Sequence, residues 1–452
     1  MTAPGRAGTR PPKPLTSLEV GVQGYKSLRD EIRMQLRPLT LVAGANSSGK
    51  SSFMQALLLL KQTLEVQFDP GPLLLNGPNV ALTSTQQLFS RGKAKHDTAA
   101  HFVVSMNLGE REVRLRFNKP SGKPVGIVSM YIRDHENAMT IHEGEFPLEP
   151  TQLLRDTMRW LSEITTIEQE RPAPDVTVRA IRNRCFLIAE ARIAGTRLEL
   201  PYFSVGPFRN ALLEMIHVPG LRGNPDRVYP TSAVGRSFPG TFERYVASLI
   251  YAWQSSRSAA NVSRLNYLNN HLHELGLTWK VHAKPADDTS VELLVGRLPH
   301  AQQGGAHDMV SIADVGFGVS QTLPVLVALV AARPGQIVYL EQPEIHLHPR
   351  AQTGLAKILA WHAQRGVIVV AETHSSLLIR ATQTAIAQGF VDNRNVALHW
   401  FTRSIDTGVT AITSASPDRR GRFHDWPIDF DDVALEADVA YLNAVEAGDA
   451  DE

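Results

Sequence analysis

The chain has 452 residues, 43% of them hydrophobic and 20% charged, which is typical of a globular protein with more than one domain. Lysine plus arginine (46) nearly balances aspartate plus glutamate (45), which excludes a strong overall field that would draw the chain to nucleic acid. A single cysteine, Cys185, excludes a disulfide framework, and the longest apolar stretch, Leu323–Ala332, is about half of a membrane span, so we expect a cytoplasmic protein without membrane contact.

The chain is predicted to open as a nucleotide-binding α/β domain. Residues 1–14 contain Pro, Gly and Arg without an apolar core, which indicates a flexible leader rather than a secretory signal. Ser17–Val22 and Leu39–Ala43 have the pattern of strands, and Ser51–Leu64 has that of a helix. A buried strand, a Gly/Ser-rich turn and a helix in this order are typical of nucleotide-binding folds.

The middle of the chain is predicted to mix strands and helices. Alternating apolar and polar residues between Ala99 and Val128 predict antiparallel strands. A Gly/Pro-rich run, Val218–Gly240, separates the next strands from two helices. The remaining predicted elements here are a helix over Thr151–Gln169, strands within Val176–Leu200, and helices over Thr241–Gln254 and Ser263–Leu275.

The last part returns to alternating helices and buried strands, which predicts a parallel sheet. The helices are Ser320–Ala332 and Arg350–Gln364, and the strands are Gln336–Glu341 and Gly366–Ala371. We therefore expect an α/β fold in which residues 15–130 and 300–415 form one nucleotide-binding domain. Residues 131–299 would be an inserted helical and strand lid region, and residues 416–452 a small C-terminal segment with an acidic tail.

Residues 44–51 match the phosphate-binding pattern GxxxxGK[ST] in full, between a predicted strand and a predicted helix. Glycines let the backbone fold around phosphates, so that N–H groups and the helix N-terminus point at negative charge. Lys50, expected at the surface of the loop, would reach the β- and γ-phosphates, and the Ser51 hydroxyl would bind Mg²⁺. The predicted ATP-binding residues are Gly44, Ala45, Asn46, Ser47, Ser48, Gly49, Lys50, Ser51 and Ser52.

Two buried strands near the end of the chain end in residues suited to a nucleotide site. Ile337–Glu341 ends in a carboxylate, the pattern of a Walker B strand, and Glu341 would hold Mg²⁺. Val367–Ala371 is followed shortly by His374, and a histidine there can donate a hydrogen bond to a γ-phosphate. On its own, His374 is better explained as an ordinary histidine at a strand end, with its hydrogen bonds satisfied.

Asp314–Gln321 precedes the long apolar helix and allows two interpretations. Small residues at a helix start can bind a phosphate donated by another subunit, which would involve Gly318, Ser320 and Gln321. Alternatively, the segment is a simple helix start with Ser320 as its N-cap.

Taken together and in this order, the motifs resemble the ABC/SMC-like ATPases of prokaryotes, near the short OLD (overcoming lysogenization defect) branch. The resemblance covers about Ser17–Ser376 and implies an ABC-type head without a long coiled coil. It implies that Gly318–Gln321 is the signature segment, Glu341 the Walker B acid and His374 the switch histidine. His346–His348 would be the D-loop, and Gln86 or Gln87 the Q-loop glutamine.

Two positions depart from the family pattern. Gln342 stands where ABC-type ATPases usually carry the glutamate that polarises the attacking water, and an amide cannot accept that proton. Hydrolysis is therefore expected to be slow unless Glu344 serves as the base. Gly318 stands where the phosphate-contacting serine usually lies, so backbone N–H groups would have to replace it.

The resemblance implies a slow ATPase that forms a dimer or higher homo-oligomer with ATP and controls a partner effector, a nuclease or toxin, in anti-phage defence or DNA repair. A non-hydrolysing ATP sensor or scaffold is the alternative. A self-contained nuclease is less favoured, because Asp429-Phe430-Asp431 has the DxD spelling of a Toprim site but no preceding buried strand.

Two further patterns are weaker still. His346 and His348 form an HxH pair without nearby cysteine partners for zinc. Two arginine groups are candidates for DNA contact, although an ordinary solvated face is the favoured interpretation of each: Arg179, Arg182 and Arg184, and Arg222, Arg227 and Arg236.

Overall fold

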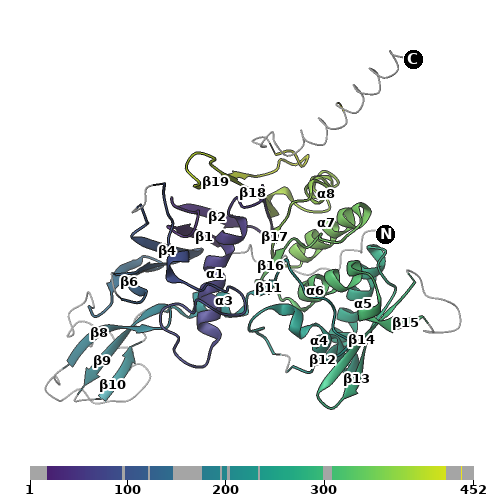
Figure 1. Cartoon of the computed structure of the whole chain (residues 1–452), viewed down its shortest axis with the longest axis horizontal. Helices are drawn as coiled ribbons and strands as arrows, with labels where there is room; N and C mark the ends of the chain where they lie inside the picture. The colour runs from purple at the N-terminus through teal and green to yellow at the C-terminus, as the bar shows by residue number, and fades with distance from the viewer. Residues whose placement is uncertain are drawn as a thin grey trace.

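The computed structural model describes residues 18–93, 97–120, 123–145, 176–193, 196–200, 204–232, 235–298, 308–423 and 439. An antiparallel sheet and a mostly parallel sheet form the two main parts of this fold (Figure 1). The mixed α/β architecture predicted from the sequence is confirmed. The predicted helix over Thr151–Gln169 and the Asp429–Asp431 segment lie outside the described residues.

The antiparallel sheet has six strands in the order β2-β1-β4-β5-β6-β7. Strands β2 and β5 alternate buried with more exposed residues, as expected for a sheet with one covered face. The domain boundary proposed at residue 130 falls inside β6, which pairs with β5 and β7. The strands are β1 (Leu18–Gln23), β2 (Ile32–Leu36), β4 (His101–Leu108), β5 (Arg111–Asn118), β6 (Gly126–Asp134) and β7 (Asn137–His142).

The second large sheet has the order β11-β16-β17-β3-β18-β19, and all its neighbours are parallel except β18 and β19. Strand β11 comes from within the region predicted as an insert and lies at the edge of this sheet. The strands are β3 (Leu39–Gly44), β11 (Ile216–Val218), β16 (Ile337–Glu341), β17 (Ile368–Glu372), β18 (Val396–Arg403) and β19 (Thr410–Ala415).

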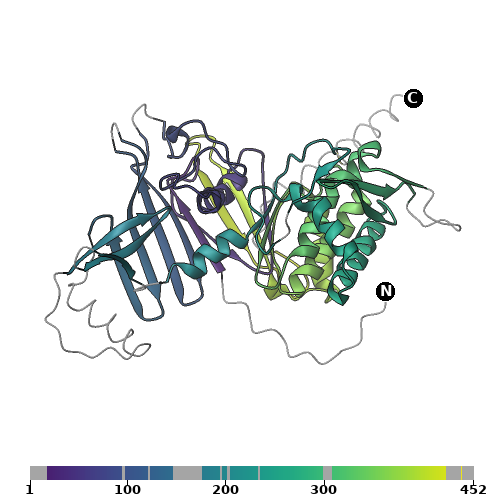
Figure 2. The ribbon, with the colours of Figure 1, turned by 90° about the horizontal axis from the view of Figure 1, so that it is seen from below.

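Helices cover both faces of this sheet, which explains why its strands are almost continuously apolar. Alternate residues point to opposite faces: Val42 and Val370 pack toward α1 (Lys50–Glu65) and the antiparallel sheet. Leu41 and Val369 pack toward the helices on the other side, visible as a separate group in Figure 2. Those helices include α4 (Val246–Ser255), α5 (Ala259–Glu274), α6 (Phe317–Ala331), α7 (Pro349–Gln364) and α8 (Ser376–Ala387).

Smaller elements complete the described fold. A three-stranded sheet contains β8 (Val176–Asn183), β9 (Phe186–Ile193) and β10 (Thr196–Leu200), and α3 (Gly206–Glu214) follows it. A four-stranded sheet lies beside α4 and contains β12 (Tyr229–Pro230), β13 (Val281–Asp287), β14 (Ser290–Gly296) and β15 (Met309–Ser311). Within the described ranges, none of the helices is both long and apolar enough to cross a membrane.

Candidate functional site

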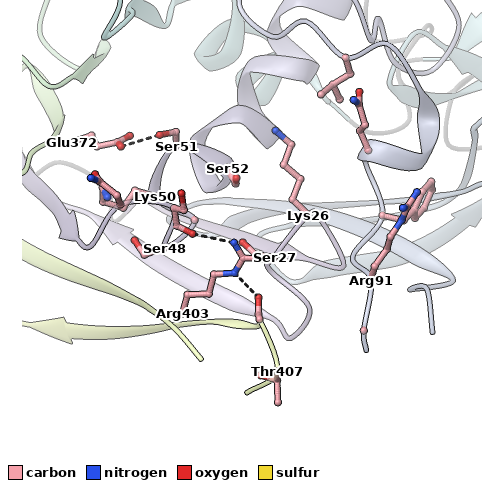
Figure 3. A pocket seen from close by; sticks show the side chains of 18 of the residues that line it. Lys26, Ser27, Ser48, Lys50, Ser51, Ser52, Arg91, Glu372, Arg403 and Thr407 are labelled. Carbon is pink, nitrogen blue, oxygen red and sulfur yellow. Dashed lines mark hydrogen bonds between the residues drawn. The ribbon is translucent and has the colours of Figure 1, made fainter. Parts of the chain in front are cut away.

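A cavity of about 770 Å³ opens where β3 meets α1. The predicted loop residues from Asn46 to Ser52 line it, together with Gln342 and His374 from the ends of the parallel strands. Both candidate Q-loop residues, Gln86 and Gln87, also line it. The cavity therefore brings together residues that are far apart in the sequence, and Figure 3 shows its two ends, with Glu372 and Ser51 at one and Arg91 at the other.

The loop between β3 and α1 depends on glycine at two positions. Gly44 has φ 139°, and a Cβ there would lie 2.1 Å from the carbonyl oxygen of Phe401 on β18. Gly49 has φ 104° and ends the loop directly before α1 begins at Lys50. The helix N-terminus therefore opens into the cavity, which is the arrangement that binds phosphate.

The Lys50 side chain folds back onto the loop rather than lying exposed as expected from the sequence. It is 3% exposed, and its Nζ donates to the carbonyl oxygens of Gly44 (3.0 Å) and Ala45 (2.8 Å). Burial lowers the pKa of Lys50, while the nearby Glu372 carboxylate opposes that shift. The ammonium group is thus held at the loop by two carbonyls that an anionic ligand would replace as its partners.

The β18–β19 hairpin contacts the phosphate-binding loop through Thr410 and Arg403. Thr410 is buried, and its hydroxyl is 2.7 Å from the carbonyl oxygen of Ser48 and 2.8 Å from the hydroxyl of Ser27. Arg403, labelled in Figure 3, donates to the carbonyl oxygen of Ser47 at 3.4 Å. The C-terminal half of the chain therefore fixes the loop of the N-terminal half.

Glu372, the last residue of β17, is a residue of this site that the sequence analysis missed. It is buried and lines the cavity, and its Oε1 accepts a hydrogen bond of 2.8 Å from the Ser51 hydroxyl. Its Oε2 accepts one of 2.9 Å from the Tyr339 hydroxyl. Burial raises the pKa of Glu372, although both hydroxyl donors oppose the shift. The sequence did contain a signal for this residue: a buried strand that ends in a carboxylate two residues before His374.

Glu341, predicted to hold Mg²⁺, points elsewhere. Its Oε1 lies 3.1 Å from Nε2 of His217, and its Oε2 accepts a hydrogen bond of 3.1 Å from the backbone N–H of Gly220. Burial opposes ionisation, but these partners together outweigh it and lower the pKa of Glu341. Glu341 is not among the residues that line the cavity.

Gln342 lies at the cavity in a constrained backbone position. Its φ of 45° is uncommon for a residue other than glycine, and its backbone N–H donates to the carbonyl oxygen of Glu372 at 2.8 Å. Its own carbonyl oxygen accepts a hydrogen bond of 2.9 Å from the buried Arg222. The residue at the position of the expected base is therefore fixed on both sides.

Glu344 holds Thr373 and His374 and is not among the residues that line the nucleotide cavity. Its Oε1 accepts hydrogen bonds from the Thr373 hydroxyl (2.7 Å) and the backbone N–H of His374 (3.0 Å). Its Oε2 is buried without a partner among the described residues. Burial and the charge of Lys50 lower the pKa of His374, so this histidine is neutral at pH 7 and can donate a single hydrogen bond.

The predicted signature segment is only partly accessible. Helix α6 begins at Phe317 with Gly316 as its N-cap, so Ser320 lies inside the helix and is not its cap. Ser320 is buried and its hydroxyl donates to the carbonyl oxygen of Phe317 at 3.3 Å. Gln321 is also buried, and its amide donates to the backbone of Arg222. The accessible part is thus the backbone around Phe317, and not the Ser320 or Gln321 side chains.

Most of the candidate DNA-binding arginines make contacts within the chain. Arg182 and Arg227 form two-bonded ion pairs with Asp69 and Asp314. Arg184 donates to carbonyl oxygens at the end of α1, and Arg222 to carbonyl oxygens beside β16 and α6. These four guanidinium groups therefore have partners within the chain, and Arg227, Arg179 and Arg236 are exposed.

The oxygen groups at the loop fit Mg²⁺. Among the described residues, no group of three or more histidine, cysteine or acidic side chains is arranged to hold a metal ion. The HxH pair of His346 and His348 therefore has no third ligand of this kind. Mg²⁺ in nucleotide sites instead uses one or two carboxylates together with phosphates and water. The Ser51 hydroxyl beside the Glu372 carboxylate supplies such hard oxygen ligands at the cavity. A bound Mg²⁺ there would neutralise phosphate charge.

Family comparisons match the two stretches of sequence that meet at this cavity. Residues 18–145 match a family described as "AAA ATPase domain". Residues 216–380 match one described as "AAA domain, putative AbiEii toxin, Type IV TA system". The first range contains the phosphate-binding loop, and the second contains β16, β17 and His374. Two stretches of the chain are therefore similar to ATPase domain families.

Solved structures similar to this chain include three SMC heads. "Crystal structure of the SmcHead bound to the C-winged helix domain of ScpA" has 11% identity and TM-score 0.48, covering 88% of this chain and 97% of that one. An SMC head domain from Thermotoga maritima has 10% identity and TM-score 0.40, covering 88% and 98%. An Smc head with an extended coiled coil, bound to the C-terminal domain of ScpA, from Pyrococcus furiosus has 10% identity and TM-score 0.43, covering 95% and 98%. No curated protein sequence matches the chain.

Proposed function

We propose that this chain is an ATP-operated switch. ATP with Mg²⁺ binds at the loop of residues 44–51 and closes two copies into a two-fold dimer. Hydrolysis is slow, and the dimer controls a partner effector, a nuclease or toxin, in anti-phage defence or DNA repair. The family description over residues 216–380, which names a putative toxin of a type IV TA system, supports the defence setting.

The continuity between the cavity and a neighbouring surface carries the dimer proposal. Gln342 and His374 line both the nucleotide cavity and a second cavity of about 390 Å³. His346 lines the second cavity, and its ring lies 5.6 Å from the ring of Phe317 at the start of α6. Phe317 is 51% exposed, so an exposed aromatic ring lies beside the second cavity, which shares Gln342 and His374 with the nucleotide cavity. Such a surface is suited to a second copy of the chain.

The lining of the nucleotide cavity supports slow hydrolysis. Glu372 is the single carboxylate among the described residues that line it, and both its oxygens accept hydrogen bonds. Gln342 stands where a general base is expected, and an amide orients water without accepting its proton. Loss of general-base assistance typically costs about 10²–10⁴-fold in rate.

Sedimentation with and without ATP-Mg²⁺ tests the dimer. Wild type is expected to change from monomer to dimer with ATP-Mg²⁺, while Lys50→Ala and Phe317→Asp remain monomeric. Lys50→Ala should fail because it no longer binds ATP tightly, and Phe317→Asp should still bind ATP. Monomeric wild type at saturating ATP-Mg²⁺ would contradict the proposal.

Val262→Asp is the matched control for Phe317→Asp. Val262 is 47% exposed and lies in the first turn of α5, as Phe317 lies at the start of α6. Residues just past the other end of α5 approach Gly318, because Leu277 lies 3.4 Å from a Cβ placed there. Val262 is therefore about 20 Å away along the helix. Its aspartate variant should dimerise normally, which separates an effect at this surface from a general effect of added charge.

Phosphate release separates the switch with slow turnover from the non-hydrolysing sensor. The sensor predicts ATP-dependent dimers and no phosphate release above that of Lys50→Ala. The proposed ATPase predicts release that is slow but abolished in Lys50→Ala. Both outcomes are read from the same protein preparations as the sedimentation experiment.

A further inference from the structure

Two carboxylates end neighbouring strands beside the phosphate-binding loop. Strands β16 and β17 are parallel, and their register pairs Glu341 with Glu372. Tyr339 and Val370, two residues earlier in each strand, belong to the core on the α1 side of the sheet. Because side chains alternate along a strand, both glutamates leave the sheet on that same side. The strand order β16-β17-β3 places Glu372 one strand from the loop and Glu341 two strands away.

The Tyr339 hydroxyl interacts with both carboxylates, but their other partners differ. Glu372 accepts hydrogen bonds from the Ser51 hydroxyl and the Tyr339 hydroxyl and lines the nucleotide cavity. Both oxygens of Glu341 are taken by the segment that contains β11, through His217 and the backbone of Gly220. Glu341 therefore has no oxygen directed at Ser51 in this arrangement, whereas Glu372 does.

Two stacked rings keep the carboxylates in these positions. The rings of His217 and Tyr339 are 5.4 Å apart and nearly parallel, at 11°. Tyr339 is fully buried and holds Glu372, while His217 is buried and holds Glu341. The other ring nitrogen of His217 lies 3.0 Å from Oδ1 of Asn79, which fixes the orientation of the imidazole. Buried aromatic rings thus hold Glu372 toward Ser51 and Glu341 toward the segment that contains β11.

We propose that Glu372, rather than Glu341, is the carboxylate that forms the Mg²⁺ position of the nucleotide site together with Ser51. Glu341 is a positioning residue that holds the segment around Gly220 beside β16. This inference rests on the proposed binding of ATP-Mg²⁺ at the loop and identifies which acid serves that site. The sequence pattern predicted that Glu341 binds Mg²⁺, and this inference assigns that role to Glu372.

The test compares Glu372→Gln with Glu341→Gln, two changes that each remove one charge and keep the side-chain size. Mn²⁺ serves as the probe in place of Mg²⁺, and its binding to protein loaded with a non-hydrolysable ATP analogue is followed by electron paramagnetic resonance. Glu372→Gln should weaken Mn²⁺ binding at least about tenfold. Glu341→Gln should weaken Mn²⁺ binding much less, because it removes a nearby charge but no proposed ligand of the metal.

Nucleotide affinity in EDTA shows whether each variant keeps an intact loop. Without metal, Glu372→Gln should bind the ATP analogue as tightly as wild type or more tightly, because a negative charge beside the phosphates is removed. The reverse pattern, or equal loss of Mn²⁺ affinity in both variants, would overturn the assignment while ATP binding stands. Absence of nucleotide binding by wild type would overturn the proposed function itself, and the two failures are therefore distinguishable.

A second variant covers the case in which Glu372→Gln does not fold. Tyr339→Phe removes only the hydroxyl that donates to Oε2 of Glu372 and keeps the stacked ring. It should weaken Mn²⁺ binding by about tenfold, the lower end of what removal of such a supporting contact costs. Wild-type Mn²⁺ affinity in a folded Tyr339→Phe protein would contradict the inference.

Discussion

At the scale of single residues, Gln342 controls the proposed rate of ATP hydrolysis. Its backbone is fixed through the carbonyl oxygen of Glu372 and the guanidinium of Arg222, so Gln342→Glu should change the side chain without moving the turn. The new carboxylate supplies a general base, and phosphate release should rise up to about 10²-fold. Repulsion from Glu372 limits the gain. Steady-state phosphate release under saturating ATP-Mg²⁺ is the measurement.

Glu344→Gln is the companion variant. Glu344 holds Thr373 and the backbone N–H of His374, and a glutamine oxygen can still accept these hydrogen bonds. Glu344→Gln should therefore retain most of the wild-type phosphate release. If Glu344→Gln is inactive and Gln342→Glu is no faster than wild type, the base is Glu344 and the assignment to position 342 is wrong.

At the scale of elements, the β18–β19 hairpin predicts how a distant part of the chain affects the loop. Thr410→Val keeps the shape of the side chain and removes the hydroxyl that contacts the Ser48 carbonyl and the Ser27 hydroxyl. The free energy of unfolding should fall by about 1–3 kcal/mol, because buried polar groups lose their partner. ATP affinity should fall with it, since the loop is held less firmly.

Denaturant titration and calorimetric ATP binding measure these two effects. Thr413→Val is the control, because Thr413 lies on the same strand but is exposed. An unchanged ATP affinity in Thr410→Val, together with the expected loss of stability, would show that the hairpin stabilises the fold without shaping the loop.

Apolar runs and turn residues predicted the elements of the parallel sheet well. The strands predicted at Leu39–Ala43 and Gln336–Glu341 correspond to β3 and β16 within one residue at each end. Strand β18 was not predicted, although its buried residues continue the sheet beside β3. Strand β11 was hidden in a Gly/Pro-rich region, because three residues carry too little periodicity to recognise.

The candidate site was predictable as a loop but not as a set of side-chain partners. The spacing of residues 44–51 identifies the loop because its chemistry requires glycines and a Lys-Ser pair in fixed order. The choice between Glu341 and Glu372 depends on which residues hold each carboxylate. His217 and Gly220 come from more than a hundred residues earlier, so local sequence around Glu341 does not contain that information.

At the scale of the whole molecule, buried histidines predict a loss of stability in mild acid. Burial lowers the pKa of His399 and of His271 to about 4, and the nearby Arg37 and Arg365 charges act in the same direction. Below the unfolded pKa of about 6.5, the unfolded chain binds protons that the native chain does not, so stability falls as the pH falls. Each histidine should account for about 2 kcal/mol between pH 7 and pH 5.

Chemical unfolding at pH 7, 6 and 5 measures this slope. His399→Gln should be less stable than wild type at pH 7 but show a shallower decline toward pH 5, because one of the buried neutral imidazoles is gone. His348→Asn is the control: His348 is exposed, and asparagine can keep its role as the N-cap of α7. A slope in His399→Gln equal to that of wild type would contradict the assignment of the pH dependence to this histidine.

The proposed two-fold dimer predicts that two inactive variants restore activity when they are mixed. In such a dimer each nucleotide lies between the loop of one copy and the start of α6 of the other, so the two sites exchange their parts by symmetry. A Lys50→Ala chain paired with a Phe317→Asp chain would form one site with both defects and one site with neither. The mixture should therefore release phosphate and sediment as a dimer with ATP-Mg²⁺, although each variant alone does neither. If the mixture is no more active than the sum of the separate proteins, both parts of each site come from the same chain, and the two-fold exchange is excluded.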